Sequence, residues 1–307
     1  MKLEVGQHLR GKAGSCKVLE QLHHGVWTAI DTNYQKVVVK TAPKQRLDNE
    51  RQVLECVGEH PCIRQMIDTS QDPPSLVLRH LDDDLLSTSN AKKLAEPDIK
   101  FVARKILEAL SALHQLGYVH TDIKPDNVLV NYGNDAARFS EVQLGDCGDV
   151  CRVDPNAGPL EGHIIGAAVF RSPEAMLNLR WGTPTDIWSF GATLISLIWG
   201  YNWHIFKPDN IEPDHEEYGL QVLVKQVSIF WAISSNFKEI ADEERLGILT
   251  AVINHINDNK MWKPFSRAED VELSEEDRNF IEKIMKLDPR DRPTAKELLQ
   301  DEWFGSA

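Results

Sequence analysis

The first part of the chain alternates apolar and polar residues in a way that predicts antiparallel strands. Between Val18 and Lys40, β-branched and apolar residues alternate with polar ones, and Gly25 and the run Asp31-Thr32-Asn33 break the pattern as turns do. The run Val37-Val38-Val39 ends one predicted strand on Lys40. Short strands are also predicted for residues 75–81, 128–130 and 142–144.

Apolar residues at helical spacing predict the helices. In residues 46–57 they recur at Leu47, Val53, Leu54 and Val57. A longer helix is predicted for residues 97–117, with proline near its start and glycine past its end. Ser274-x-x-Asp277 and Thr294-x-x-Glu297 are capping boxes that begin two late helices.

Length and charge narrow the classes of function. A chain of 307 residues suits one large domain or two closely packed lobes. The net charge of −13 disfavours binding to nucleic acid or to an anionic membrane and mildly favours basic substrates, although it also suits solubility alone. The most apolar run, residues 188–203, is interrupted by Gly191 and Gly200 and is shorter than the roughly 20 residues of a membrane span.

The five cysteines are odd in number and scattered, which favours a reducing compartment, the cytosol or the nucleus. Cys147-x-x-x-Cys151 has no second cysteine pair at ligand spacing, so a zinc site is disfavoured. Gly6-x-x-x-x-Gly11-Lys12-Ala13 differs from a P-loop by the alanine in place of Ser or Thr, and the five residues before it barely allow the required strand. We therefore do not expect it to bind phosphate.

The segment from His120 to Asn127 concentrates chemistry in a loop, because Pro125 cannot lie inside a helix or a central strand. A carboxylate at Asp122 can accept a hydroxyl proton. Lys124 can neutralise phosphate charge, and the amide oxygen of Asn127 can hold a metal ion. The segment resembles the catalytic loop H-R-D-x-K-x-x-N of eukaryotic protein kinases, with Thr121 in place of arginine.

The sequence His-Thr-Asp-Ile-Lys-Pro is most similar to that of the SR-protein kinases and Clk-like kinases of the CMGC group. The resemblance implies a serine/threonine kinase with a bilobal α+β fold, in which a small antiparallel β lobe with one main helix is joined to a larger, mostly helical lobe. ATP would lie in the cleft. The N-lobe would be residues 1–81, including an extension of residues 1–17, and the C-lobe residues 82–307. ATP, Mg²⁺ and a protein substrate are the implied ligands. Asp126 and the acidic hinge lie where basophilic kinases recognise arginines before the acceptor residue, so the resemblance also suggests Arg-rich or Arg-Ser substrates.

Further motifs follow in the order found in kinases. Lys40 would contact the α and β phosphates and pair with Glu50, and Asp146 of Asp146-Cys147-Gly148 would hold Mg²⁺ together with Asn127. In the fifth strand and hinge, Leu78 would be the gatekeeper, Leu81 would offer backbone groups to adenine, and Asp84 would reach the ribose. Gly25 and Leu129 complete the nucleotide set that the resemblance implies. Asp186 would hold the backbone of the catalytic loop, and Glu174 would pair with Arg292.

Several positions depart from the kinase pattern. Gly25 is the only glycine of the nucleotide-covering loop, so either His23 and Thr28 replace the outer glycines or the loop is shortened. Cys147 stands in place of phenylalanine, and Ala167 in place of a bracing threonine. Between Cys147 and Arg171 there is no Ser, Thr or Tyr, which excludes activation by phosphorylation inside this segment. The alternative is a pseudokinase scaffold that binds a partner protein and turns over little ATP.

Overall fold

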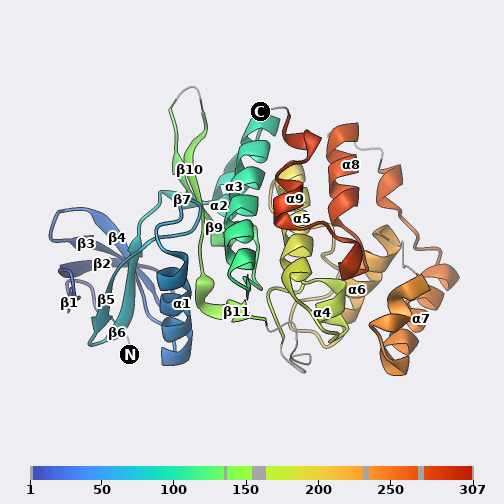
Figure 1. Ribbon diagram of the computed structural model, residues 1–307, viewed down its shortest axis with the longest axis horizontal. Coiled ribbons are helices and arrows are strands. Elements are labelled where there is room, and N and C mark those ends of the chain that lie inside the picture. Colours follow the sequence, from blue (N-terminus) through green and yellow to red (C-terminus); the bar gives the residue numbers. More distant parts are fainter. Residues whose placement is uncertain (1–2, 135–136, 154–163, 231–234, 269–272, 306–307) are drawn as a thin grey trace. The chain divides into compact units, whose positions relative to one another are not determined.

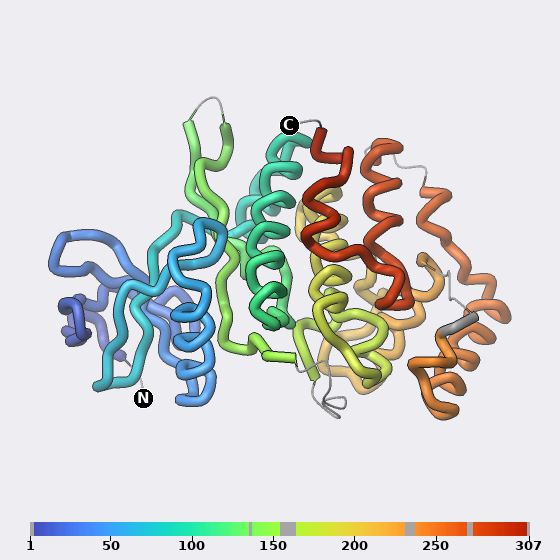
Figure 2. Tube along the Cα trace, viewed as in Figure 1, coloured from blue at the N-terminus to red at the C-terminus, as the bar shows by residue number. Residues whose placement is uncertain are grey.

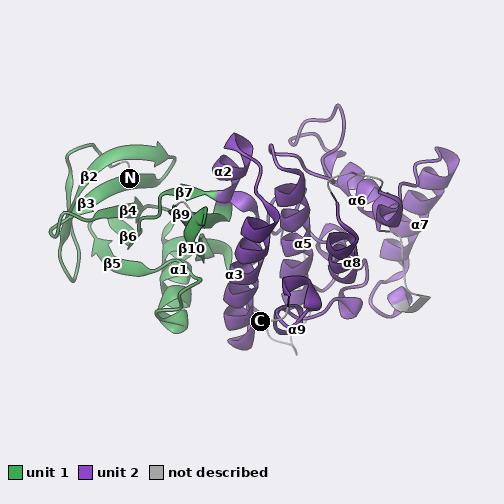
Figure 3. Cartoon of the chain, turned by 90° about the horizontal axis from the view of Figure 1, so that it is seen from above, with its two compact units in different colours: residues 1–84, 127–150 green, residues 85–126, 151–307 purple. Residues whose placement is uncertain are grey.

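The computed structural model describes residues 3–134, 137–153, 164–230, 235–268 and 273–305. The chain divides into two compact units, which Figure 3 colours green and purple. Unit 1 comprises residues 1–84 and 127–150, and unit 2 comprises residues 85–126 and 151–307. The predicted lobes, 1–81 and 82–307, differ from these units mainly at residues 127–150, and the lobe boundary stays a prediction.

Unit 1 contains a six-stranded antiparallel sheet in the order β1-β2-β3-β4-β6-β5 (Figure 1). An isolated bridge between Gly11 and Ser70 joins the chain after β1 to the far edge strand, β5, so the sheet curls toward itself. Alternate residues of the strands point inward and form a core that includes Leu9, Val18 and Val39. The strands are β1 His8–Arg10, β2 Ser15–His23, β3 Val26–Asp31, β4 Lys36–Lys40, β5 Met66–Gln71 and β6 Pro74–Arg79.

The predicted strands between Val18 and Lys40 are confirmed as β2, β3 and β4. The expected N-terminal extension contributes β1 and the start of β2, because Leu9 and Cys16 are buried in the core of the sheet. The predicted helix near residues 46–57 is confirmed as α1, Lys44–Val57, which buries Leu47, Val53 and Leu54.

A smaller sheet completes unit 1. In it, β9 Val128–Tyr132 lies between β7 Asp83–Asp84 and β10 Phe139–Leu144. In the tube of Figure 2, β9 and β10 run side by side as an antiparallel hairpin. The pairing of β9 with β7, and the bridge between Leu144 of β10 and Ile63 before β5, connect residues 127–150 to the rest of unit 1.

Unit 2 is mostly helical. Its longest helix, α3 Glu96–Gln115, buries the apolar face that the sequence predicted and packs against α5 and α9. Nearly every residue of α5 is buried, which explains its continuous apolar sequence. The other helices of at least four residues are α2 Leu85–Ala91, α4 Pro173–Met176, α5 Thr183–Trp199, α6 Tyr218–Ile229, α7 Glu243–Asp258, α8 Glu275–Ile284 and α9 Ala295–Leu298. The remaining strands, β8 Tyr118–Val119 and β11 Cys151–Arg152, pair antiparallel.

The two predicted capping boxes behave differently. At α9, Thr294 and Glu297 each satisfy the other's backbone N–H, so the box is complete. At α8, Ser274 accepts the N–H of Asp277, but the Asp277 carboxylate accepts from Ser274 Oγ and Trp303 Nε1. Within the described ranges, the chain forms no helix with the length and apolar character of a membrane span.

Candidate active site

In unit 1, Lys40 joins two carboxylates from distant parts of the chain. Lys40 ends β4, and its Nζ lies 2.6 Å from Glu50 Oε2 of α1 and 2.6 Å from Asp146 Oδ1. Glu50 is only 2% exposed, and a buried carboxylate needs such a partner. Burial lowers the pKa of Lys40, but Glu50 and Asp146 outweigh it and raise that pKa above its usual range. The predicted Lys40–Glu50 pair is therefore formed, and Lys40 carries its charge at neutral pH.

Backbone geometry places Asp146 beside Asn127. Val128 pairs with Leu144 in the β9–β10 hairpin, and the N–H of Gly145 donates to the carbonyl of Asn127 at 2.8 Å. Asp146 itself has φ of 56°, a left-handed conformation that is uncommon outside glycine. Strained backbone conformations of this kind persist only where surrounding contacts hold them, and they are common at functional sites.

The two predicted metal ligands suit Mg²⁺. Asp146 offers a carboxylate and Asn127 an amide oxygen, which are the hard ligands that Mg²⁺ binds together with water and phosphate oxygens. The described residues contain no cluster of three or more His, Cys, Asp or Glu side chains that could hold a metal. Mg²⁺ usually takes only one or two protein carboxylates beside substrate phosphates, so this pair fits a nucleotide-bound ion.

A further cation, Arg64, lies near these carboxylates and was not predicted from the sequence. Its Nε donates to the carbonyl of Arg79 at 2.9 Å. Burial lowers the pKa of Arg64 to about 10, while Glu50 and Asp146 oppose this decrease. Arg64 therefore stays charged at neutral pH and adds positive charge next to the proposed phosphate and metal ligands. A single arginine in the loop before β5 gives no sequence signal of this kind.

The predicted hinge residues all belong to unit 1. Leu78 is 1% exposed in β6, paired with Val38 of β4, and Leu81 is buried just after that strand. Asp84 in β7 pairs with Leu129 in β9. These positions bring Asp84 and Leu129 together, while their contacts with a nucleotide stay predictions.

Of the two alternatives for the predicted nucleotide-covering loop, the structure has the shortened one. β2 ends at His23 and β3 begins at Val26, so His24 and Gly25 alone form the turn. Gly25 has φ of +78°, and a Cβ there would lie 2.5 Å from the carbonyl oxygen of Thr41. Thr41 follows Lys40, and its N–H donates to the carbonyl of Gly25 at 2.7 Å. Glycine is thus required for a turn that packs on the end of the Lys40 strand. A contact of Gly25 with a nucleotide stays a prediction.

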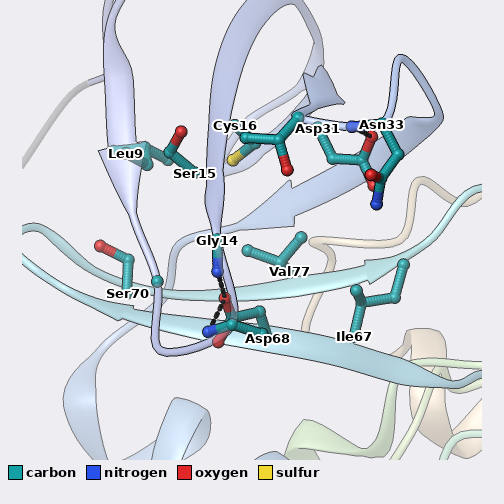
Figure 4. A pocket seen from close by; sticks show the side chains of 13 residues that line it. Leu9, Gly14, Ser15, Cys16, Asp31, Asn33, Ile67, Asp68, Ser70 and Val77 are labelled. Atoms are coloured by element: carbon teal, nitrogen blue, oxygen red, sulfur yellow. Dashed lines mark hydrogen bonds between the residues drawn. The ribbon is translucent and has the colours of Figure 1, made fainter.

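The P-loop-like segment uses its backbone donors internally, as Figure 4 shows. The Asp68 carboxylate accepts the N–H groups of Lys12 at 2.9 Å, Ala13 at 2.9 Å and Gly14 at 3.2 Å. A cavity of about 100 Å³ adjoins these bonds. The N–H groups that a P-loop would turn toward phosphate already bind Asp68 here, which supports the interpretation made from the sequence.

In unit 2, the catalytic loop brings Lys124 between two carboxylates. Lys124 Nζ lies 3.1 Å from Asp122 Oδ2 and 3.4 Å from Asp126 Oδ2. Burial lowers the pKa of Lys124, but Asp122 and then Asp126 outweigh it and raise that pKa. Pro125 begins a short 3-10 turn, where its missing N–H is not needed, so the expectation of a loop holds.

The loop is held by Asp186 of α5, as predicted. Its carboxylate is fully buried and accepts the N–H of His120 at 2.7 Å and the N–H of Thr121 at 2.9 Å. His114 Nε2 of α3 lies 2.9 Å from the same carboxylate. Thr121 has φ of +70°, a strained conformation for a β-branched residue. Asp186 therefore holds the strained backbone that precedes Asp122.

The comparison with known families agrees with this geometry. Residues 4–304 match the protein kinase domain. The chain belongs to the protein kinase family. Membership implies a phosphotransferase that uses ATP with a divalent metal, typically Mg²⁺, and acts on protein. The bilobal α+β class predicted from the sequence agrees with this family and with the two compact units.

In this kinase, the residue just before Ala167 packs tightly on the catalytic loop. Gly166 has φ of +56°, and a Cβ there would lie 2.6 Å from the carbonyl oxygen of Thr121. Arg171 donates to the carbonyls of Ile165 at 2.5 Å and Gly166 at 2.7 Å. Arg171, which was not predicted to take part, thus fixes the segment before Ala167 without a threonine hydroxyl. Residues 154–163 of the predicted activation segment lie outside the described residues.

Cys147 is 1% exposed, and burial raises the pKa of its thiol, with Glu50 adding to the increase. Because the thiolate is the reactive form, this cysteine is a poor redox group.

The predicted buried ion pair of the kinase is present: Arg292 Nη1 lies 2.7 Å from Glu174 Oε1, and neither side chain is exposed.

Proposed function

We propose that this kinase phosphorylates serine and threonine residues of proteins. The observation that carries the proposal is the contact of Lys40 with both Glu50 and Asp146 at 2.6 Å. Unit 2 supplies the second charged group, in which Lys124 lies 3.1 Å from Asp122. In each unit, a lysine that the kinase resemblance assigns to phosphate is therefore already held in place by carboxylates.

Each residue then has a chemical role. Lys40, fixed by Glu50, binds the α and β phosphates, and Asp146 and Asn127 would hold Mg²⁺, which neutralises phosphate charge when bound. Asp122 orients the substrate hydroxyl and accepts its proton as the oxygen attacks the γ-phosphorus. Lys124 stabilises the negative charge on the transferred group. Lys124 in this position, rather than the arginine arrangement of tyrosine kinases, supports serine and threonine as acceptors.

We propose that activity does not depend on phosphorylation of the activation segment. No Ser, Thr or Tyr hydroxyl lies between Cys147 and Arg171, and Thr121 replaces the arginine that would bind the phosphate of a phosphorylated activation segment.

We also propose a preference for Arg-rich substrates. The Asp126 side chain is 44% exposed beside Lys124, and the net charge of −13 attracts basic chains. The odd number and scattered positions of the five cysteines support a reducing compartment, the cytosol or the nucleus.

The test is a transfer assay with labelled ATP, Mg²⁺, an Arg-Ser-rich peptide and a generic basic protein. We expect the wild type to label serine or threonine and Asp122→Asn to lose about 10³-fold in kcat, within the range of general-base contributions. Asp126→Asn is the matched control in the same loop, and it should change KM for the peptide more than kcat. If the wild type transfers no more label than Asp122→Asn, the proposal fails.

A second candidate is a pseudokinase scaffold, and the two-residue turn at His24 and Gly25 favours it. A loop this short offers little backbone to cover phosphates, so ATP would bind weakly. Calorimetry with Mg-ATP separates the candidates. Binding together with transfer supports the enzyme. Absence of both, with an intact thermal unfolding transition, supports the scaffold.

A further inference from the structure

One polar face of α1 is directed at the segment that follows β10. Arg46, Asn49 and Glu50 are spaced i, i+3 and i+4, which places them on the same side of the helix. Glu50 binds Lys40, as described above. Arg46 and Asn49 are one turn or less from it and contact residues 146–150 of unit 1.

The contacts are direct and involve both side chains and backbone. Arg46 Nη2 lies 2.5 Å from Asp149 Oδ2 and 3.8 Å from Asp146 Oδ1. Asn49 Nδ2 donates to the carbonyls of Gly148 at 3.0 Å and Val150 at 2.8 Å. We call these contacts of Arg46 and Asn49 the α1 latch.

Gly148 leaves the space that the latch needs. A Cβ at this position would lie 3.3 Å from Arg46 Nε and 3.4 Å from Asp146 Oδ1. The glycine of Asp146-Cys147-Gly148 therefore allows the guanidinium to approach the turn. Cys147 is buried in this turn but has a smaller apolar side chain than phenylalanine, so polar contacts carry more of the attachment of α1.

We infer that Arg46 and Asn49 are positioning residues that keep α1 where Glu50 can hold Lys40, with Asp149 as the built-in acidic partner of Arg46. Kinases that are switched by phosphorylation order this part of the molecule through new arginine–phosphate pairs. Here the segment from 148 to 170 has no hydroxyl to phosphorylate, and a carboxylate encoded in the chain supplies the negative charge. The inference rests on the proposed kinase activity and concerns how that activity is kept on.

Four variants of the 307-residue chain test the α1 latch in the transfer assay described above. The Arg46–Asp149 pair is partly exposed, so we expect Arg46→Ala and Asp149→Asn each to lower kcat/KM for ATP by about fivefold, equivalent to about 1 kcal/mol. The double variant should lose no more than either single one, because both changes remove one interaction. Asp149→Glu keeps the charge and should retain at least about a third of the activity, which a purely steric role of Asp149 does not predict.

The control is Arg51→Ala, because Arg51 forms a similarly exposed pair with Asp48 on the same helix at 3.2 Å, but away from residues 146–150. This variant should stay within about twofold of the wild type. Additive effects of Arg46→Ala and Asp149→Asn would overturn the inference, and so would an equal loss in Arg51→Ala.

Hydrogen exchange of the amides of residues 44–57 separates this inference from the proposed function. Arg46→Ala should exchange these amides about tenfold faster, and Arg51→Ala should exchange them like the wild type. If the wild type shows no transfer at all, the proposed function fails, and exchange still decides whether the latch holds α1. Unchanged exchange in both Arg46→Ala and Asn49→Ala refutes the latch whatever the activity.

Discussion

The change of Asp186 to asparagine tests how the catalytic loop is held. The carboxylate has no exposure and accepts from the N–H groups of His120 and Thr121, with His114 at 2.9 Å. Asparagine has nearly the same shape but only one acceptor oxygen, and its amide nitrogen must face a donor. At least one of these hydrogen bonds is therefore lost, and one buried donor is left without a partner.

The magnitude follows from these bonds. A hydrogen bond to a charged group contributes about 1.5–3 kcal/mol, so Asp186→Asn should lower the free energy of unfolding by about 2–4 kcal/mol. The φ of +70° at Thr121 costs about 1–3 kcal/mol, which the bond to Asp186 now offsets. Without that bond the backbone relaxes and displaces Asp122, and a displacement of about 1 Å can cost about 10²-fold in rate.

The assay measures kcat, KM for ATP and thermal unfolding side by side. We expect kcat to fall about 10²-fold, while KM for ATP changes little because Lys40 and Asp146 are not touched. The control is Asp277→Asn, another buried carboxylate of unit 2, which accepts from Ser274 and Trp303. It should lower stability without a comparable loss of kcat.

A second variant tests the strain itself. Thr121→Gly in the Asp186→Asn background should recover part of the stability, because glycine adopts positive φ at little cost. Loss of stability without loss of kcat in Asp186→Asn would refute the positioning role. Equal losses of kcat in Asp186→Asn and Asp277→Asn would show that instability alone explains the effect.

Three further predictions concern stability, measured by urea unfolding. Gly25→Ala should cost more than about 2 kcal/mol, because φ is +78° and the new Cβ would meet the Thr41 carbonyl at 2.5 Å; a neutral effect contradicts this. Arg292→Met should cost about 3–5 kcal/mol by leaving Glu174 buried and unpaired, and adding Glu174→Met should recover part of that loss. The N–H groups of Thr69 and residues 12–14 outweigh burial and lower the pKa of Asp68, so its contribution is full above the ordinary carboxyl pKa. Asp68→Asn should cost about 1 kcal/mol at pH 7, and its difference from wild type should shrink as pH falls below about 4; a constant difference refutes this.

Strands and helices could be predicted from the sequence where the spacing of apolar residues stays regular over the whole element. The alternation before Lys40 and the helical spacing of Leu47, Val53 and Leu54 predicted β2, β3, β4 and α1 within a few residues. The strands of two or three residues, β1, β7, β8 and β11, were not predicted, because such short segments carry no measurable period. Their pairing depends on partners far away in the chain.

In the candidate site too, some residues could be predicted from the sequence and others could not. Lys40, Glu50 and Asp146 could be proposed because their motifs occur in order, and the ion pairs between them are present. Arg64 could not, because its proximity to Glu50 depends on burial that a lone arginine does not reveal. Arg46 and Asp149 are 103 residues apart, and no local pattern connects them.

Two of the departures from the kinase pattern, Ala167 and Cys147, each coincide with a replacement contact. Ala167 lacks a hydroxyl, and Arg171 binds the carbonyls of the two residues before it. Cys147 offers less apolar surface, and Arg46 and Asn49 bind the turn around it. A scaffold without catalysis has no need to keep Asp122 and Lys40 oriented, so these contacts favour the enzyme over the scaffold. The shortened turn at Gly25 has no such replacement, and ATP affinity is therefore the quantity on which the two candidates differ most.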